Sequence, residues 1–169
     1  MDQYVFNCNN KTNCEAISKS IKLLYKDELP VIICIGSDLV VGDSLGPYVG
    51  SELNKRLNGK AYVYGTLQSP ITAKEILTVK QHVSKIHPNS QTIIIDAAIG
   101  NEEELGYVKI SNCGIKPGLG VNKDLPQIGD VSIIAILSSK IDKTNNFTTR
   151  FSLVYKTAND IINGVLSAF

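Results

Sequence analysis

The chain has 169 residues, of which 43% are hydrophobic and 20% are charged, so it is long and apolar enough to fold around a core. Lys and Arg number 17 against 16 Asp and Glu, and the formal charge of +1 excludes a bulk attraction to nucleic acid or to anionic membranes. No apolar run approaches the roughly 20 residues that span a bilayer, and the N-terminus has no signal-peptide pattern, so we expect a cytoplasmic protein.

Helix and strand patterns alternate along the first part of the chain. Thr12 and Glu15 have the spacing of a capping box and predict the start of a helix. A continuous apolar run over 31–35 predicts a strand that is buried on both faces. An apolar side chain at every fourth position predicts a helix over 44–57, and residues 61–64 predict a second strand.

A second capping-box pair, Thr72 and Glu75, predicts the start of the next helix. The apolar run over 92–95 predicts a third strand, which we expect to end at Asp96. The remaining predictions are a short strand over 107–110, a loop over 114–126, a buried strand over 131–137, a turn over 140–146 and a helix over 151–169. This order predicts a three-layer α/β/α sandwich around a mixed, mostly parallel sheet, as a single domain over residues 1–169.

The sequence is poor in the residues of nucleophilic and metal sites. Its two histidines, His82 and His87, are expected on the surface and at the end of a helix, respectively. Four cysteines form no C-x-x-C pair and are expected to pack as small apolar side chains; they are Cys8, Cys14, Cys34 and Cys113. We therefore expect the chemistry of this protein to depend on carboxylates.

Acidic residues follow two of the predicted strands. The loop after residues 31–35 holds Gly36, Asp38 and Asp43, and Asp96 follows the third strand directly. Ligands of open α/β sheets bind beyond the carboxyl ends of the strands. If the two strands are neighbours, Asp43 and Asp96 reach one crevice from different elements. The loop matches neither G-x-G-x-x-G nor a Walker sequence, so nucleotide binding is not predicted.

Each of these aspartates also has a purely structural interpretation. Asp43 could cap the helix that follows it, a position that Asp favours. Asp96 could bind backbone amides where its strand turns into a loop, and Asp38 could be a solvated turn residue. For either residue of the pair taken alone, the structural interpretation is the commoner one. The coincidence of two acids at two strand ends favours a functional site.

Four blocks in the same order resemble the YyaC-type sporulation proteins, which are often called spore proteases. The blocks lie at residues 35–47, 63–67, 94–97 and 114–121. They are similar also to the germination protease that degrades small acid-soluble spore proteins, and more faintly to the hydrogenase maturation endopeptidases. The resemblance implies a phosphorylase/hydrolase-like fold, which agrees with the α/β prediction.

The resemblance implies an aspartic-type endopeptidase linked to sporulation and spore germination. The catalytic candidates of the germination protease match Asp43 and Asp96. The residues expected to line the substrate site are Gly36, Asp38, Gly65, Thr66, Lys116 and Gly118. The maturation endopeptidases bind a metal through acidic residues and a histidine. Asp43 matches one such ligand, but no histidine here has a recognisable equivalent, so no metal or other cofactor is expected.

The expected reaction is hydrolysis of a peptide bond in a protein substrate. A close aspartate pair can activate water and protonate the leaving nitrogen when the two carboxyls share one proton. Asp43, near a helix N-terminus, is expected to be ionised and act as the base, and Asp96 to hold the proton. Two alternatives stay open: a non-catalytic sporulation protein that binds a peptide or protein partner in the same crevice, and a metal-assisted peptidase. A homo-oligomer is compatible with the sequence.

Overall fold

The structure is a computed structural model that describes residues 3–7, 13–26, 29–116, 127–139 and 149–169. Six strands and four α-helices lie in these ranges. In chain order they are β1 (Gln3–Asn7), α1 (Asn13–Leu24), β2 (Val31–Cys34), α2 (Leu45–Arg56), β3 (Tyr62–Tyr64), α3 (Ile76–Ile86), β4 (Thr92–Gly100), β5 (Tyr107–Ser111), β6 (Val131–Ser139) and α4 (Phe151–Ala168). Two short 3-10 helices, η1 (Val41–Asp43) and η2 (Glu102–Glu104), precede α2 and β5.

All six strands form one mixed sheet in the order β1-β5-β6-β4-β2-β3. The β6–β4, β4–β2 and β2–β3 pairs are parallel, whereas β1–β5 and β5–β6 are antiparallel. β4 lies between β6 and β2, so the strands predicted over 31–35 and 92–95 are indeed neighbours. The predicted α/β class and the mixed, mostly parallel sheet are confirmed.

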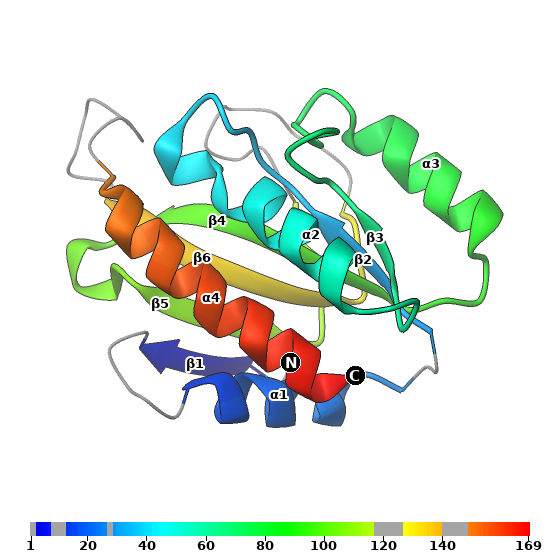
Figure 1. Cartoon of the computed structure of the whole chain (residues 1–169), viewed down its shortest axis with the longest axis horizontal. Coiled ribbons are helices and arrows are strands. Elements are labelled where there is room, and N and C mark those ends of the chain that lie inside the picture. The colour runs from blue at the N-terminus through cyan, green and yellow to red at the C-terminus, as the bar shows by residue number, and fades with distance from the viewer. Residues whose placement is uncertain (1–2, 8–12, 27–28, 117–126, 140–148) are drawn as a thin grey trace.

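Helices α2 and α4 cross in front of the sheet in Figure 1, and α3 lies beyond its β3 side. Helices α1, α2 and α4 pack on one face, where fully buried side chains such as Ile17, Leu53 and Ile162 meet Ile93 and Ile133 of the central strands. Helix α3 packs on the opposite face, where its Ile76 and Val83 belong to one buried cluster with Val31 and Ile33 of β2. The alternation of side chains along β2 and β4 therefore supplies two separate apolar cores.

One strand was not predicted, and two predicted boundaries are wrong, each for a physical reason. β1 was not predicted because it is a half-exposed edge strand whose ends are the polar residues Gln3 and Asn7. β4 does not end at Asp96 but continues to Gly100, because β6 still pairs with it beyond the apolar run. Glu75, rather than Thr72, is the N-cap of α3; Thr72 donates its backbone N–H and its hydroxyl to the Glu75 carboxylate.

Other predictions lie partly or wholly outside the described residues. These are the Thr12 cap, most of the 114–126 loop and the 140–146 turn. Within the described part of the chain, no helix combines the length and the apolarity needed to cross a membrane.

Candidate active site

An opening in the sheet begins where β2 ends beside β4. The two strands pair from Val31 with Thr92 to Cys34 with Ile95, and the Ile35 N–H donates to the Ile95 carbonyl at 2.8 Å. The chain then leaves the sheet at Gly36, whereas β4 continues. From Asp96 onward, β4 has β6 on one side and no β2 partner on the other. Such a divergence at the carboxyl ends of parallel strands is where α/β proteins bind ligands.

The loop after β2 folds back so that Asp43 returns to the end of its own strand. The Ser37 N–H donates to the Asp43 carbonyl at 3.0 Å. Gly36 has φ +143°, and a Cβ there would lie 2.1 Å from the same carbonyl oxygen. Only glycine fits both this conformation and this close approach. Gly36 therefore holds Asp43 beside the opening.

The capping interpretation of Asp43 does not describe its place in the structure. Asp43 is the last residue of η1, and Ser44 is the N-cap of α2. The Ser44 hydroxyl donates to the Val41 carbonyl at 2.8 Å rather than accepting from the first turn of α2. The Asp43 carboxylate is thus positioned by η1 and Gly36.

Asp96 lies on β4 at the first position beyond the β2 pairing, and its carboxylate Oδ1 accepts the Ala97 N–H at 2.8 Å. The amide-binding interpretation is correct to that extent, although the bond forms within a strand and not in a turn. Burial raises the pKa of Asp96 well above its usual range, and the negative charge of Asp43 raises it further. The Ala97 hydrogen bond lowers it only in part.

Burial also raises the pKa of Asp43, to about 6, and a hydrogen bond from the Ser37 backbone offsets part of this rise. Desolvation thus outweighs any effect of the nearby helix N-terminus on the pKa of Asp43. Burial and the Asp43 charge favour the protonated form of Asp96, and the pair titrates as a unit.

The raised pKa of Asp43 makes a prediction for stability. Below pH 4 the carboxyl is protonated in both the folded and unfolded chains, so it contributes nothing. Between pH 4 and about 6 it ionises in the unfolded chain first, which favours unfolding as the pH rises. We expect Asp43→Asn to raise the free energy of unfolding by about 1–2 kcal/mol at pH 7, after allowance for solvent screening, and by nothing at pH 3.5. Urea unfolding at both pH values measures the difference, and an equal effect at both would contradict the raised pKa.

Close glycine contacts join α2 and the loop after β3 to the end of β2. A Cβ on Gly46 would lie 1.9 Å from the Ile35 carbonyl oxygen, and one on Gly50 would lie 2.0 Å from that of Gly65. Gly65 itself has φ +86° and would place a Cβ 1.8 Å from the Cys34 carbonyl oxygen. The backbones of α2, of the loop after β3 and of the end of β2 are therefore in direct contact near the aspartate pair.

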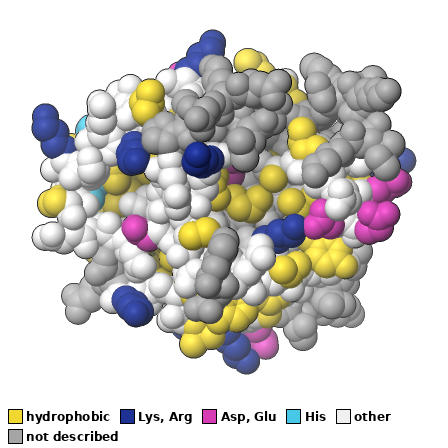
Figure 2. All heavy atoms as spheres, turned by 180° about the vertical axis from the view of Figure 1, so that it is seen from behind, with side chains coloured by type: hydrophobic (Ala, Val, Ile, Leu, Met, Phe, Trp, Pro, Cys, Tyr) yellow, Lys and Arg dark blue, Asp and Glu magenta, His cyan; other side chains and the backbone are white. Residues whose placement is uncertain are grey.

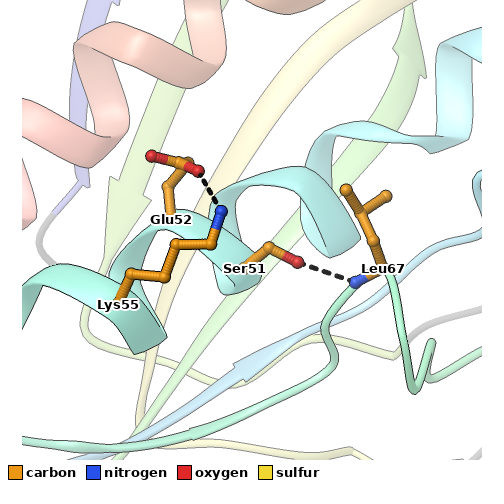
Figure 3. Close-up of polar contacts among 4 residues, drawn as sticks. All are labelled: Ser51, Glu52, Lys55 and Leu67. Atoms are coloured by element: carbon orange, nitrogen blue, oxygen red, sulfur yellow. Dashed lines mark hydrogen bonds and ion pairs between the residues drawn. The ribbon is translucent and has the colours of Figure 1, made fainter.

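A buried serine fixes the loop after β3 to α2. The Ser51 hydroxyl accepts the Leu67 N–H at 2.8 Å, and Figure 3 shows this side chain directed from α2 to the loop. On the same helix, Lys55 pairs with Glu52 at 3.0 Å toward solvent (Figure 3). Sequence reasoning missed Ser51; its signal is a polar residue next to Gly50 inside an otherwise apolar helix stripe.

The structure brings only some of the expected substrate-site residues to the opening. Gly36 lies where the chain leaves β2 and closely approaches the Asp43 carbonyl, and Gly65 closely approaches the Cys34 carbonyl at the end of the same strand. The Thr66 hydroxyl accepts the Ser69 N–H at 3.2 Å within its own turn. Asp38 is exposed on a turn, and Lys116 is exposed after β5. Gly118 lies outside the described residues.

Among the described residues, no histidine or cysteine side chain is placed at the opening. His82 is exposed, and His87 caps the end of α3 and bonds the Tyr64 hydroxyl at 2.8 Å. Cys34 is fully buried, and burial raises the pKa of its thiol. Cys14 and Cys113 are half-buried free thiols, and Cys8 lies outside the described residues. No group of three or more His, Cys, Asp and Glu side chains gathers as a metal site in the described ranges.

A separate hollow of about 420 Å³ lies at the amino ends of β2 and β4, beside α3. Two charged groups that line it already have protein partners. The Lys80 ammonium donates to the Gln127 carbonyl at 2.8 Å, and the Asp130 carboxylate accepts the Thr92 N–H at 2.8 Å. Because the aspartate pair lies toward the opposite ends of these strands, we place the candidate site at the pair and not in this hollow.

Comparisons with known proteins support one part of the resemblance. A family model described as "Protein of unknown function (DUF1256)" matches residues 5–164. The "Uncharacterized protein YyaC" of Bacillus subtilis (strain 168) is 37% identical over 137 residues, which cover 80% of this chain and 67% of that protein. The similarity to YyaC is confirmed, and the relationship to the germination protease and to the maturation endopeptidases stays a prediction. The chain belongs to the DUF1256 family.

Proposed function

We propose that this protein hydrolyses peptide bonds in a protein substrate, with Asp43 and Asp96 as an aspartate pair that shares one proton. The observation that carries the proposal is the convergence of two carboxyls, from η1 and from β4, at the open end of the sheet. They lie close enough that the charge of Asp43 raises the pKa of Asp96. Perturbed, coupled carboxyls are more frequent at catalytic sites than elsewhere.

In the proposed reaction, the two carboxyls have different roles. The Asp43 carboxylate takes a proton from a water molecule as the water oxygen bonds to the substrate carbonyl carbon. The Asp96 carboxyl donates a hydrogen bond to the developing oxyanion. The proton on Asp43 then passes to the leaving nitrogen as the C–N bond breaks, which restores the ionised form of Asp43. Asp96 keeps its proton throughout, so the pair returns to its starting state.

The surroundings of the pair support a polypeptide as the substrate. Exposed apolar side chains occupy the two loops that follow β2 and β3: Leu39 is 88% exposed, Val41 39% and Leu67 40%. Apolar groups exposed around a polar site suit a protein ligand better than a small polar metabolite. The YyaC relative belongs to a Bacillus, a spore-forming genus, which supports a substrate among spore proteins such as the small acid-soluble ones.

A cleavage assay tests this proposal. The purified protein is incubated with small acid-soluble spore proteins and with a proteome-derived peptide library, and new termini are identified by mass spectrometry. The proposal expects cleavage that Asp43→Asn and Asp96→Asn both abolish and that a chelator leaves unchanged. Chelator-sensitive cleavage would favour a metal-assisted peptidase. Peptide binding without turnover would favour a non-catalytic binding protein.

The pH dependence of cleavage should be bell-shaped. Asp43 must be ionised to act as the base, so kcat/KM should rise with pH through an apparent pKa near 6. Asp96 must keep its proton, so kcat/KM should fall again as the pair loses that proton at higher pH. Initial rates from pH 3 to 10 measure both limbs. A maximum below pH 4, where both carboxyls are protonated, would contradict these protonation states.

A further inference from the structure

A row of side chains crosses the sheet from Asp96 to a lysine. Asp96 of β4 pairs with Ile134 of β6, and Ile134 pairs with Lys109 of β5. Directly paired residues point to the same face of a sheet. Their neighbours Ile95, Ile133 and Ile110 belong to the core beneath α1, α2 and α4, so the row lies on the opposite face. Asp96, Ile134 and Lys109 therefore share the face on which α3 packs.

Much of this face has no helix above it among the described elements. Helix α3 packs with residues of β2 and with Ile94 at the start of β4, and no residue of the row belongs to that core. Ile134 is half-buried, and the Lys109 side chain keeps 29% of its exposure. Figure 2 shows hydrophobic side chains in the hollowed centre of this face, with Lys or Arg and Asp or Glu beside them. The row thus places the apolar side chain of Ile134 between Asp96 and the cationic Lys109.

We propose that the substrate chain crosses this face from the aspartate pair, and that Lys109 binds an acidic side chain of the substrate. Two strand spacings of about 4.8 Å put Lys109 about 10 Å from Asp96 along the row. An extended chain covers this distance in about three residues. The preferred substrate therefore carries an apolar residue over Ile134 and Glu or Asp about three residues from the cleaved bond. This inference rests on the proposed function for the position of that bond.

Lys109 has the capacity to bind such a carboxylate. Its ammonium pairs with the Glu104 Oε1 at 2.6 Å, and an ammonium has three donors. Glu104 is held in turn, because its Oε2 accepts the Asn101 N–H at 2.9 Å in the capping box of η2. Glu104 therefore competes with an incoming acid for the Lys109 ammonium. Removing the Glu104 charge should strengthen the binding of acidic peptides, and removing the Lys109 charge should weaken it.

Peptide binding tests the inference without cleavage. Six fluorescein-labelled octapeptides carry a central Leu, to lie over Ile134, and either Glu, Gln or Lys two residues before or after it, and anisotropy measures their Kd. The wild-type protein should bind one of the two Glu peptides about tenfold tighter than its Gln counterpart. Lys109→Gln should remove this preference, Lys109→Glu should transfer it to the Lys peptide, and Glu104→Gln should increase it. Lys55→Gln, which breaks the exposed Lys55–Glu52 pair on the other face, is the matched control and should change nothing.

The outcomes separate this inference from the proposed function. A preference that survives Lys109→Glu, or the absence of binding by all six peptides, would overturn the inference. Cleavage of spore proteins that does not depend on Lys109 would leave the hydrolysis proposal intact and refute the role of the lysine. If the protein prefers acidic peptides through Lys109 but cleaves none of the substrates, the role of the lysine stands and the hydrolysis proposal is refuted. Circular dichroism melting curves show whether each variant is folded.

Discussion

Asp96→Asn should lower the rate of peptide hydrolysis by about 10²–10³-fold, the usual cost of losing a hydrogen-bond donor to the developing oxyanion. The amide keeps nearly the shape of the carboxyl, and its oxygen can still accept the Ala97 N–H. It cannot hold the shared proton between the two side chains. Because burial and the Asp43 charge already disfavour an ionised carboxylate at this position, the variant should remain folded. Single-turnover rates with a saturating substrate measure the loss in kcat.

A matched substitution separates this effect from a general loss of negative charge. Asp130 also lies next to β4, but its carboxylate accepts the N–H of the first residue, Thr92, at 2.8 Å, whereas Asp96 is in the middle of the strand. Asp130→Asn keeps this acceptor and should leave the hydrolysis rate within about twofold of the wild type. An Asp96→Asn protein with the wild-type rate would remove Asp96 from the reaction.

Gly65→Ala should prevent stable folding. The new Cβ would lie 1.8 Å from the Cys34 carbonyl oxygen, and the backbone at φ +86° is itself unfavourable for alanine. Neither the end of β2 nor α2 can move away, because Gly50 contacts the Gly65 carbonyl oxygen from the other side. We expect a loss of more than about 4 kcal/mol in the free energy of unfolding, which is a large part of the stability of a typical domain.

Gly59→Ala is the control for the backbone conformation alone. Gly59 has φ +81°, close to that of Gly65, but no atom lies within 4 Å of the position that its Cβ would take. The expected cost is therefore only the conformational one, about 1 kcal/mol. Urea unfolding of the two variants compares the costs. Equal destabilisation would show that the close contact of Gly65 with Cys34 does not matter.

The elements that follow apolar periodicity could be predicted from the sequence, whereas those set by distant pairing could not. The run before Asp96 predicts a strand, but its continuation to Gly100 depends on β6, whose sequence lies more than 30 residues further on. β1 has no buried run and exists because β5 offers it an edge. Local propensity has no information on either pairing.

The same distinction applies to the candidate site. Asp43 and Asp96 could be found because each follows an apolar run and a strand end marks a ligand position in α/β sheets. Their raised pKa values could not be predicted, since they depend on how deeply the fold buries each carboxyl. Lys109 was missed because its alignment with Asp96 exists only through the registers of two strand pairs.

The coupled titration of Asp43 and Asp96 tests the central claim most directly. Carbon-13 NMR of the side-chain carboxyls follows both residues from pH 3 to 10 in the wild-type protein and in Asp43→Asn. We predict that Asp43 titrates near pH 6, that Asp96 titrates above it, and that Asp43→Asn lowers the apparent pKa of Asp96 because the neighbouring charge is gone. Two independent titrations near pH 4, with Asp96 unaffected by Asp43→Asn, would show that the carboxyls share no proton and would contradict the account.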